Sequence, residues 1–142
     1  MENIRAVLDD RSMFHVEQHQ TVAEVARTMA NLNVGAILVL ERGELRGIFS
    51  ERDLMTRVVV PGRDINATRV QEVMTSSPVT IQESASTEEA MERMRRHKCR
   101  HLPVLRGAEV IGMVSMRDLM NLELEKKTEE IAYMRSYIAG AS

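Results

Sequence analysis

Aromatic residues and cysteine are scarce in this sequence, and each scarcity excludes a class of protein. The chain has no tryptophan and only 3% aromatic residues, which argues against a stacking platform for single-stranded nucleic acid. Its one cysteine, Cys99, cannot form a disulfide within the chain, so a reducing compartment is expected. The longest strongly apolar run covers residues 36–40, far short of the roughly 18 residues that a membrane span needs. Because the first residues also do not resemble a signal peptide, we expect a cytoplasmic protein with no membrane partner.

The remaining composition is that of an ordinary globular domain. The 142 residues are 44% hydrophobic and 28% charged, with a formal net charge of −2. A length of about 100–200 residues is usual for one domain. The near-balance of charge argues against a surface built wholly for nucleic acid or for an anionic membrane. With 11 methionines, the core is expected to consist of aliphatic side chains and methionine.

The sequence repeats itself without a gap after 65 positions, so that the segment beginning at Phe14 aligns with the segment beginning at Val79. Hydrophobic patterning alone does not select Gly, Ser or Asp, so chance matching of two amphipathic segments explains the identities poorly. The identical pairs include Glu24/Glu89, Met29/Met94, Gly47/Gly112, Ser50/Ser115 and Asp53/Asp118.

Each copy predicts the same order of elements, β-α-β-β-α. After a short apolar stretch, two pairs fit a capping box at a helix start: Thr21 with Glu24 in the first copy, and Ser86 with Glu89 in the second. Two short strands follow, at 36–40 and 45–49 in the first copy and at 102–105 and 110–114 in the second. A second helix begins after Ser50 and after Ser115. Two such copies, packed sheet against sheet around one core, give a fold of the α/β (α+β) class.

We divide the chain into a first repeat (8–58), a linker (59–73), a second repeat (74–122) and a C-terminal helix (123–142). Pro61 and Gly62 act as the breaker in the linker. The last helix is expected to start near Met116, to extend to about Ile138 and to end at Gly140. Its mixed charges predict a solvated face, although its surplus apolar positions also suit packing on a second chain.

The most specific motif, at residues 47–53 and again at 112–118, places a glycine in a strand, a serine at its end and an aspartate in the first turn of the next helix. One interpretation is a plain helix start with a serine N-cap. The other is a ligand site, because a helix N-terminus attracts phosphate and the two oxygens of a carboxylate match the two hydroxyls of a ribose. The presence of two copies at the same corner favours the ligand site.

This repeated Gly-hydrophobic-x-Ser-x-x-Asp motif resembles the cystathionine-β-synthase (CBS) domain, of which a tandem pair is called a Bateman module. Residues 99–104 (Cys-Arg-His-Leu-Pro-Val) resemble a strand motif of that family, and residues 73–79 resemble the start of a repeat. The resemblance covers about residues 8–122, and the C-terminal helix is similar to that of stand-alone bacterial members. It implies a non-catalytic regulatory sensor with two clefts between its repeats, which bind AMP, ADP, ATP, NAD(H) or S-adenosylmethionine.

The resemblance also implies roles for individual residues. The aspartates would hold the ribose hydroxyls, the serines would contact ribose or α-phosphate, the first strand of each copy would hold adenine, and the basic residues would face phosphate. We also expect Arg63, in the linker, to reach a phosphate, although each arginine alone is equally compatible with a solvated side chain. The candidate ligand-binding residues are Phe14, His15, Val16, Gly35, Ala36, Ser50, Arg52, Asp53, Arg63, Val79, Thr80, Ile81, Arg100, His101, Pro103, Ser115, Arg117 and Asp118.

The two copies differ where phosphate would be held. Gly35 and Ala36 occupy the positions of Arg100 and His101, and Leu38 occupies that of Pro103. The basic side chains are therefore present on one side only, which makes equal phosphate binding in both clefts doubtful.

Other chemistries have weaker support. His97, Cys99 and His101 alternate as zinc ligands on a strand would, but His97 is expected to end a helix and a fourth ligand is missing. No metal is expected, a buried thiol is the simpler interpretation of Cys99, and no arrangement typical of an enzyme is present.

Two further functions stay open: a protein-interaction scaffold with empty clefts, and a nucleic-acid binder that uses the basic run at 93–100. The expected partners are a nucleotide, a second copy of the chain and a regulated protein in trans.

Overall fold

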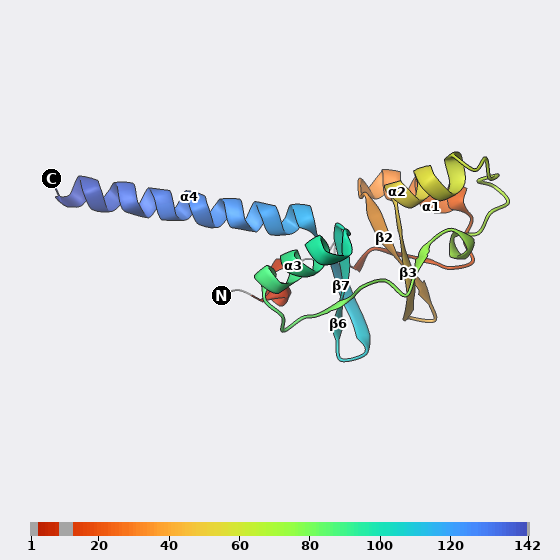
Figure 1. The fold of residues 1–142 in the computed structure, drawn as a ribbon, viewed down its shortest axis with the longest axis horizontal. Coiled ribbons are helices and arrows are strands. Elements are labelled where there is room, and N and C mark those ends of the chain that lie inside the picture. Colours follow the sequence, from red (N-terminus) through yellow and green to blue (C-terminus); the bar gives the residue numbers. More distant parts are fainter. Residues whose placement is uncertain (1–2, 9–12, 142) are drawn as a thin grey trace.

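A computed structural model describes residues 3–8 and 13–141 and shows two β-sheets with flanking helices, from which one long helix projects (Figure 1). The first sheet has the order β1 (His15–Glu17), β2 (Ala36–Glu41), β3 (Glu44–Ser50), β4 (Thr75–Ser76), and the second has the order β5 (Ile81–Gln82), β6 (His101–Arg106), β7 (Glu109–Ser115). In each sheet the first two strands are parallel and the next pair is antiparallel. The expected α+β fold of two pseudo-symmetric repeats is confirmed.

The first helix of each repeat begins at the expected cap. Thr21 caps α1 (Val22–Leu32) in a reciprocal capping box with Glu24. At α3 (Thr87–His97) only half of the box forms, because Ser86 accepts from the Glu89 backbone while the Glu89 carboxylate pairs with Arg93. The capping box expected at both helix starts is therefore confirmed at Thr21 and formed only in part at Ser86.

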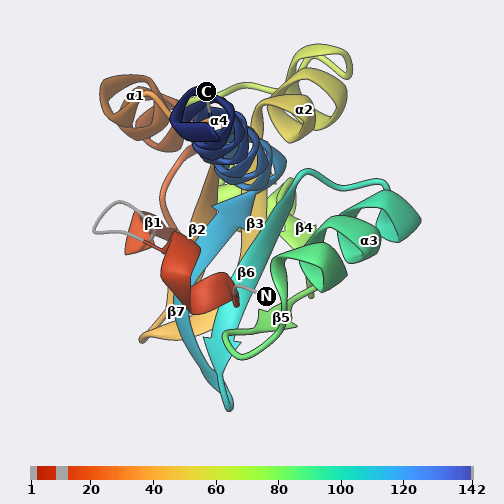
Figure 2. The same ribbon diagram turned by 90° about the vertical axis from the view of Figure 1, so that its left-hand side faces the viewer.

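The two sheets pack face to face, and alternate residues of each strand serve different cores. On β2, Ile37 and Val39 face the helices of the first repeat, whereas Leu38 and Leu40 lie in a cluster shared with Val110 of β7. The view in Figure 2 shows the sheets one behind the other, with helices around them. This shared apolar cluster makes one body of the two repeats and brings the equivalent ends of their strands together.

The core of each repeat includes a residue from the segment that precedes the other repeat in the chain. The 3-10 helix η1 (Ile4–Val7) packs into the core of the second repeat, where Ile4 is fully buried. Equivalently, η4 (Val70–Glu72) places Val70 in the core of the first repeat. The backbone bonds match as well, since Ile4 donates to Ala85 at 2.9 Å and Val70 donates to Gln20 at 2.8 Å. The sequence did not predict this exchange of leading segments.

The first strand is shorter in the second repeat than in the first, because a proline lies on its partner strand. In the first repeat His15 pairs with Leu38, but in the second the equivalent pair, Thr80 with Pro103, is missing and β5 begins only at Ile81. Proline has no N–H to donate. The extra strand β4 was also not predicted, and it extends the first sheet by pairing with β3.

The last helices differ more between the repeats than expected. In the first repeat α2 (Glu51–Asp53) continues as a π-helix, η3 (Leu54–Val59), which ends in a run of β-branched valines, residues with low helix propensity. In the second repeat α4 (Met116–Ala141) runs for 26 residues. The expectation that Gly140 ends this helix is wrong, since the helix continues through it. Within the described residues, no helix is long and apolar enough to cross a membrane.

Candidate ligand-binding site

In the first repeat, the serine–aspartate corner is closed by internal bonds. Ser50 and Asp53 form a reciprocal capping box, with the Ser50 N–H donating to Asp53 Oδ2 at 3.0 Å and the Asp53 N–H donating to Ser50 Oγ at 3.2 Å. Thr75 Oγ1 donates to Asp53 Oδ1 at 3.2 Å, and Arg57 Nε lies 3.7 Å from the same oxygen. Asp53 is only 7% exposed. Both of its carboxylate oxygens are therefore occupied by the protein.

The equivalent corner of the second repeat is open. Ser115 donates its N–H to Asp118 Oδ2 at 3.0 Å, and its Oγ accepts from the Asp118 N–H at 3.0 Å. The position of Arg57 is taken by Leu122, which cannot pair with a carboxylate. Asp118 is exposed, and within the described part of the chain its carboxylate bonds only to Ser115. One carboxylate oxygen thus remains available to a ligand at the start of α4.

The starts of the central strands lie beside these corners, as the motif predicts. Ala36 pairs with Ser50 across the first sheet, and His101 pairs with Ser115 across the second. The backbone hydrogen bonds follow the same symmetry. In both repeats the first residue of the second helix donates its N–H to the carbonyl of the residue before the central strand: Glu51 to Gly35 at 2.9 Å and Met116 to Arg100 at 2.8 Å. The structure therefore brings Ala36 to Ser50, and Arg100 and His101 to Ser115.

The charges of both corners act on His101. Burial lowers the pKa of His101, the carboxylates of Asp118 and Glu51 oppose this shift, and Arg100 adds to it. Glu51 belongs to the first repeat, so the two corners share one electrostatic environment. The Glu51 carboxyl carbon lies 3.5 Å from where a side chain would begin at Gly35. A glycine at this position leaves room for that carboxylate.

Glu51 and Thr75 are the residues at these corners that the sequence analysis missed. Glu51 aligns with Met116 in the second copy, so the exchange of an apolar side chain for a charged one was visible in the alignment. Thr75 had no such signal, because its contact with Asp53 depends on the unpredicted strand β4.

The first strands, which are expected to hold adenine, have most of their side chains in or against the cores of their own repeats. Val16 and Ile81 are buried in the cores of their own repeats, and Phe14 and Val79 pack against those cores. The carbonyl of Thr80 accepts a bond of 2.6 Å from Arg93. His15 is exposed, with its Nδ1 3.1 Å from the carbonyl of Met13.

The remaining candidate residues differ in their surroundings. Arg63 donates to Glu72 at 2.7 Å, so its guanidinium is already paired. Arg52 and Arg117 are exposed, and Pro103 is buried on β6 opposite Met113.

The basic run on α3 is largely neutralised by neighbouring acids. Arg95 forms two hydrogen bonds with Glu92, and Arg93 pairs with Glu89 at 3.3 Å. Such pairing within the helix reduces the net positive charge that a nucleic-acid surface would need.

The thiol of Cys99 is poorly placed for nucleophilic chemistry. It is half-buried, and burial raises its pKa, which lowers the thiolate fraction. His97 is the last residue of α3, so it does not share a strand face with Cys99 and His101. Over residues 3–8 and 13–141 there is no group of three or more side chains suited to a metal ion.

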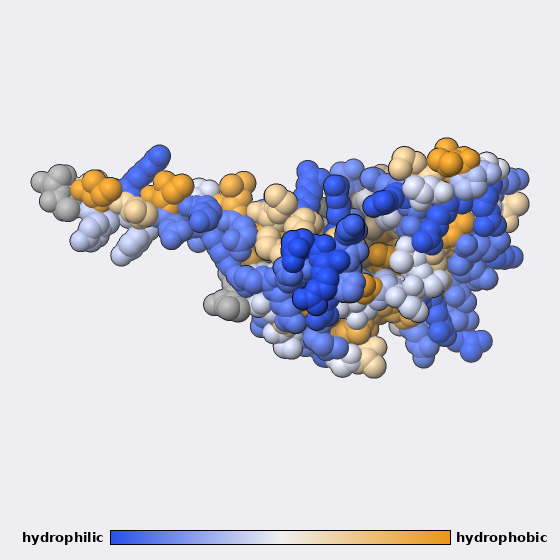
Figure 3. Space-filling view, viewed as in Figure 1, coloured by the Kyte–Doolittle hydropathy of each residue, from blue (hydrophilic) through white to orange (hydrophobic). Residues whose placement is uncertain are grey.

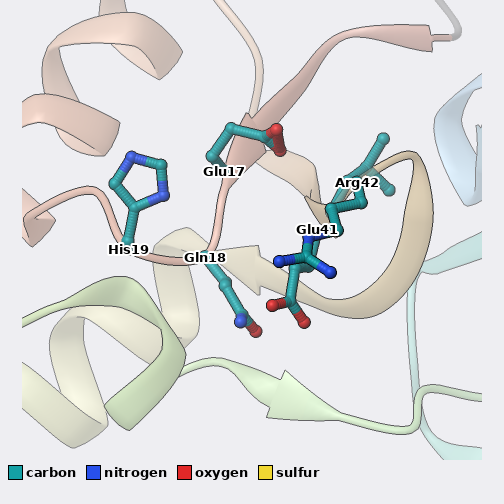
Figure 4. A pocket seen from close by; sticks show the side chains of 6 residues that line it. Glu17, Gln18, His19, Glu41 and Arg42 are labelled. Carbon is teal, nitrogen blue, oxygen red and sulfur yellow. The ribbon is translucent and has the colours of Figure 1, made fainter.

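A hollow of about 250 Å³ lies at the hairpin end of the first repeat, away from the serine–aspartate corners (Figure 4). It contains none of the candidate ligand-binding residues. Glu17 contributes a buried Oε2 without a hydrogen-bond partner among the described residues. The lining residues are Glu17, Gln18, His19, Leu40, Glu41 and Arg42.

The chain has two repeats whose leading segments are exchanged, and in each repeat a serine and an aspartate cap the start of a helix. These features are typical of a tandem regulatory module. The chain belongs to the CBS domain family, whose profile matches residues 4–60 and 70–125. It is a tandem CBS pair, a Bateman module.

Known proteins support this assignment over most of the chain. A protein with CBS domains from Burkholderia ambifaria has 34% sequence identity and a TM-score of 0.83, with 87% of this chain and 95% of that one covered. The CBS domain protein PAE2072 from Pyrobaculum aerophilum, complexed with AMP, has 28% identity and a TM-score of 0.76, with 82% and 89% covered. The mitochondrial CBS domain-containing protein CBSX3 of Arabidopsis thaliana is 32% identical over 136 residues; the match covers 92% of this chain but only 66% of that protein.

Proposed function

We propose that this CBS pair is a non-catalytic sensor that binds an adenine nucleotide at the corner of its second repeat. The observation that carries the proposal is the exposed Asp118, whose carboxylate lies at the start of α4, in the second repeat that also supplies Arg100 and His101. The AMP complex of the Pyrobaculum relative supports the choice of ligand class.

Each part of the nucleotide has a matching group at this corner. The unoccupied oxygen of Asp118 accepts from a ribose hydroxyl, and the Ser115 hydroxyl donates to a ribose or phosphate oxygen. The positive end of the α4 dipole and the guanidinium of Arg100 attract phosphate. Because the protein has few aromatic residues, adenine is held by aliphatic side chains and backbone groups.

The corner of the first repeat is proposed to bind nucleotide less well. A ligand there must displace Thr75 and Arg57 from Asp53, and the Glu51 carboxylate adds a negative charge near any phosphate. Only one of the two corners is therefore expected to be filled at low ligand concentration.

The output of such a sensor is a change in conformation. A ligand shifts the equilibrium between two arrangements only as far as it binds one of them more tightly. We propose that a homodimer transmits this change to a protein in trans and that the module works in a reducing compartment such as the cytoplasm.

Titration calorimetry with AMP, ADP, ATP, NADH and S-adenosylmethionine tests the proposal. At least one of these ligands should bind with a stoichiometry near one per chain. Asp118→Ala should abolish the heat of binding, whereas Glu125→Ala, an exposed acid further along α4, should leave it unchanged. Absence of heat and of a thermal shift with all five ligands contradicts the sensor function.

A scaffold role is the second candidate. It is favoured by the hollow in Figure 4, which lies away from the corners. A scaffold would bind none of the five ligands, so the same titrations separate the two functions.

A further inference from the structure

The distal part of α4 is exposed along its described length. The helix leaves the body and extends away from both sheets (Figure 1). From Lys127 onward its described side chains are exposed. An isolated helix of this length is marginally stable in water, because packing of an apolar face supplies most helix stability in proteins. The helix therefore needs a partner to stay ordered.

The exposed aliphatic and methionine side chains of α4 form one stripe, and the exposed Tyr133 and Tyr137 lie outside it. Leu124, Ile131 and Ile138 are spaced by seven residues, and they are 66%, 50% and 67% exposed. Met120 and Met134 lie two heptads apart on the same face, with Lys127 between them. Figure 3 shows apolar side chains along this projecting helix. A spacing of three and four residues over the same face is typical of a coiled-coil seam.

A second copy of α4 fits this stripe in length, spacing and charge. Identical helices laid side by side in parallel match every apolar layer with its own equivalent. In that arrangement Glu130 of one helix flanks the seam beside Arg135 of the other, which gives two attractive pairs by symmetry. An antiparallel arrangement would instead place the two Glu130 side chains near each other.

Lys127 is compatible with a two-stranded seam. Its long aliphatic stem can cover the neighbouring layers while the ammonium group reaches water. A single polar residue in such a seam lowers stability but selects register and the number of strands.

We propose that the stripe formed by Met120, Leu124, Lys127, Ile131, Met134 and Ile138 pairs in parallel with the same stripe of a second copy. This coiled coil joins two CBS pairs at the same end of their helices. The inference does not depend on nucleotide binding at the Asp118 corner.

Disulfide cross-linking of the full chain tests the pairing and its direction. In a Cys99→Ser background, Ile138→Cys places one thiol on the stripe, and Tyr133→Cys places one thiol on the opposite face as a matched control. With diamide as oxidant, Ile138→Cys should form a covalent dimer at least tenfold faster than Tyr133→Cys. Equal rates for the two variants overturn the proposal, because a lone, antiparallel or differently partnered helix gives the equivalent thiols at position 138 no advantage.

A charge placed on the stripe provides the second measurement. By sedimentation, Ile131→Glu should shift the self-association constant by at least tenfold toward the less associated form, and Tyr133→Glu should leave it as in the unchanged chain. Far-UV circular dichroism at matched concentration verifies that the sheets remain folded. An Ile131→Glu chain that associates like the Tyr133→Glu chain contradicts the proposal, whatever the result of nucleotide titrations.

Discussion

Glu17 and Gln82 occupy equivalent positions in the two repeats, and only the amide is satisfied. Gln82 accepts from the Gly107 N–H at 3.1 Å and donates to the Gly107 carbonyl at 3.0 Å. The equivalent turn residue of the first repeat is Arg42, and Glu17 keeps a buried Oε2 without a hydrogen-bond partner among the described residues.

Exchange of these two side chains should change stability in opposite directions. Glu17→Gln supplies the missing donor and should raise the free energy of unfolding by about 0.5–1.5 kcal/mol. Gln82→Glu removes a donor and should lower it by a similar amount. Urea unfolding of both variants measures the effect, and a loss of stability in Glu17→Gln would show that the carboxylate has another role.

The two aspartates of the capping corners should differ in their effect on stability. Asp53→Ala removes a cap and leaves the partly buried Thr75 hydroxyl and the Arg57 guanidinium without their carboxylate partner, so it should cost about 1–3 kcal/mol. Asp118→Ala removes only an exposed cap and should cost about 0.5–1 kcal/mol. Thermal unfolding of the two variants makes the comparison; equal losses would contradict the view that only Asp53 is engaged by its own chain.

His101 should make stability depend on pH in the mildly acidic range. Because burial lowers the pKa of His101 in the folded state, the unfolded chain binds the proton at higher pH. The contribution of His101 to the free energy of unfolding is complete above about pH 6.5, the ordinary histidine pKa. This contribution is lost as the pH falls toward the lower pKa of the folded state.

The replacement His101→Gln should therefore flatten the stability profile between pH 7 and pH 5.5. Urea unfolding at both pH values, with the unchanged chain alongside, isolates this contribution from that of other groups. A profile as steep as that of the unchanged chain would show that His101 does not supply the dependence.

At the scale of elements, the exchanged leading segments tie the two repeats together. Ile4→Ala should cost about 2–5 kcal/mol, because Ile4 is fully buried in the core of the second repeat. Arg5→Ala, an exposed neighbour on the same segment, should change stability by less than about 0.5 kcal/mol. Urea unfolding distinguishes them, and a small loss for Ile4→Ala would mean that η1 does not contribute to the core.

The sequence predicted the elements whose causes are local. Thr21 with Glu24 marks a helix start, and the glycine-containing turns separate paired strands wherever they occur in the chain. The register of β5 is not local, since it depends on the missing N–H of Pro103 some twenty residues away. The exchange of leading segments depends on the complete fold in the same way, and so does the contact of Thr75 with Asp53.

For the candidate site, too, the sequence predicted the local features and not those that depend on tertiary neighbours. The repeated motif identified both corners, and the alignment identified Arg100 and His101 as present on one side only. Which carboxylate is buried could not be read from it, because Ser50 and Asp53 have the same identities as their equivalents. The difference arises from tertiary neighbours, namely Thr75 and Arg57.

At the scale of the whole molecule, the two pseudo-symmetric repeats differ in the surroundings of their serine–aspartate corners. At one corner the carboxylate is bonded within its own chain, while the other corner keeps an exposed carboxylate beside basic residues. The long α4 begins at this open corner, at Met116, and extends to the proposed seam with a second copy. A ligand at the corner would contact the helix that we propose to join two chains, which would give the proposed sensor a physical route to its output.

The most direct test of the sensor function is an NMR titration of the isotopically labelled chain with AMP. Binding at the Asp118 corner should concentrate the backbone shifts at residues 100–101 and 115–118, and the signals of Asp53 and Thr75 should move less. GMP, which presents a different base, should perturb these residues more weakly at the same concentration. An absence of shifts, or shifts centred on the hollow between Glu17 and Arg42, would contradict nucleotide binding at the Asp118 corner.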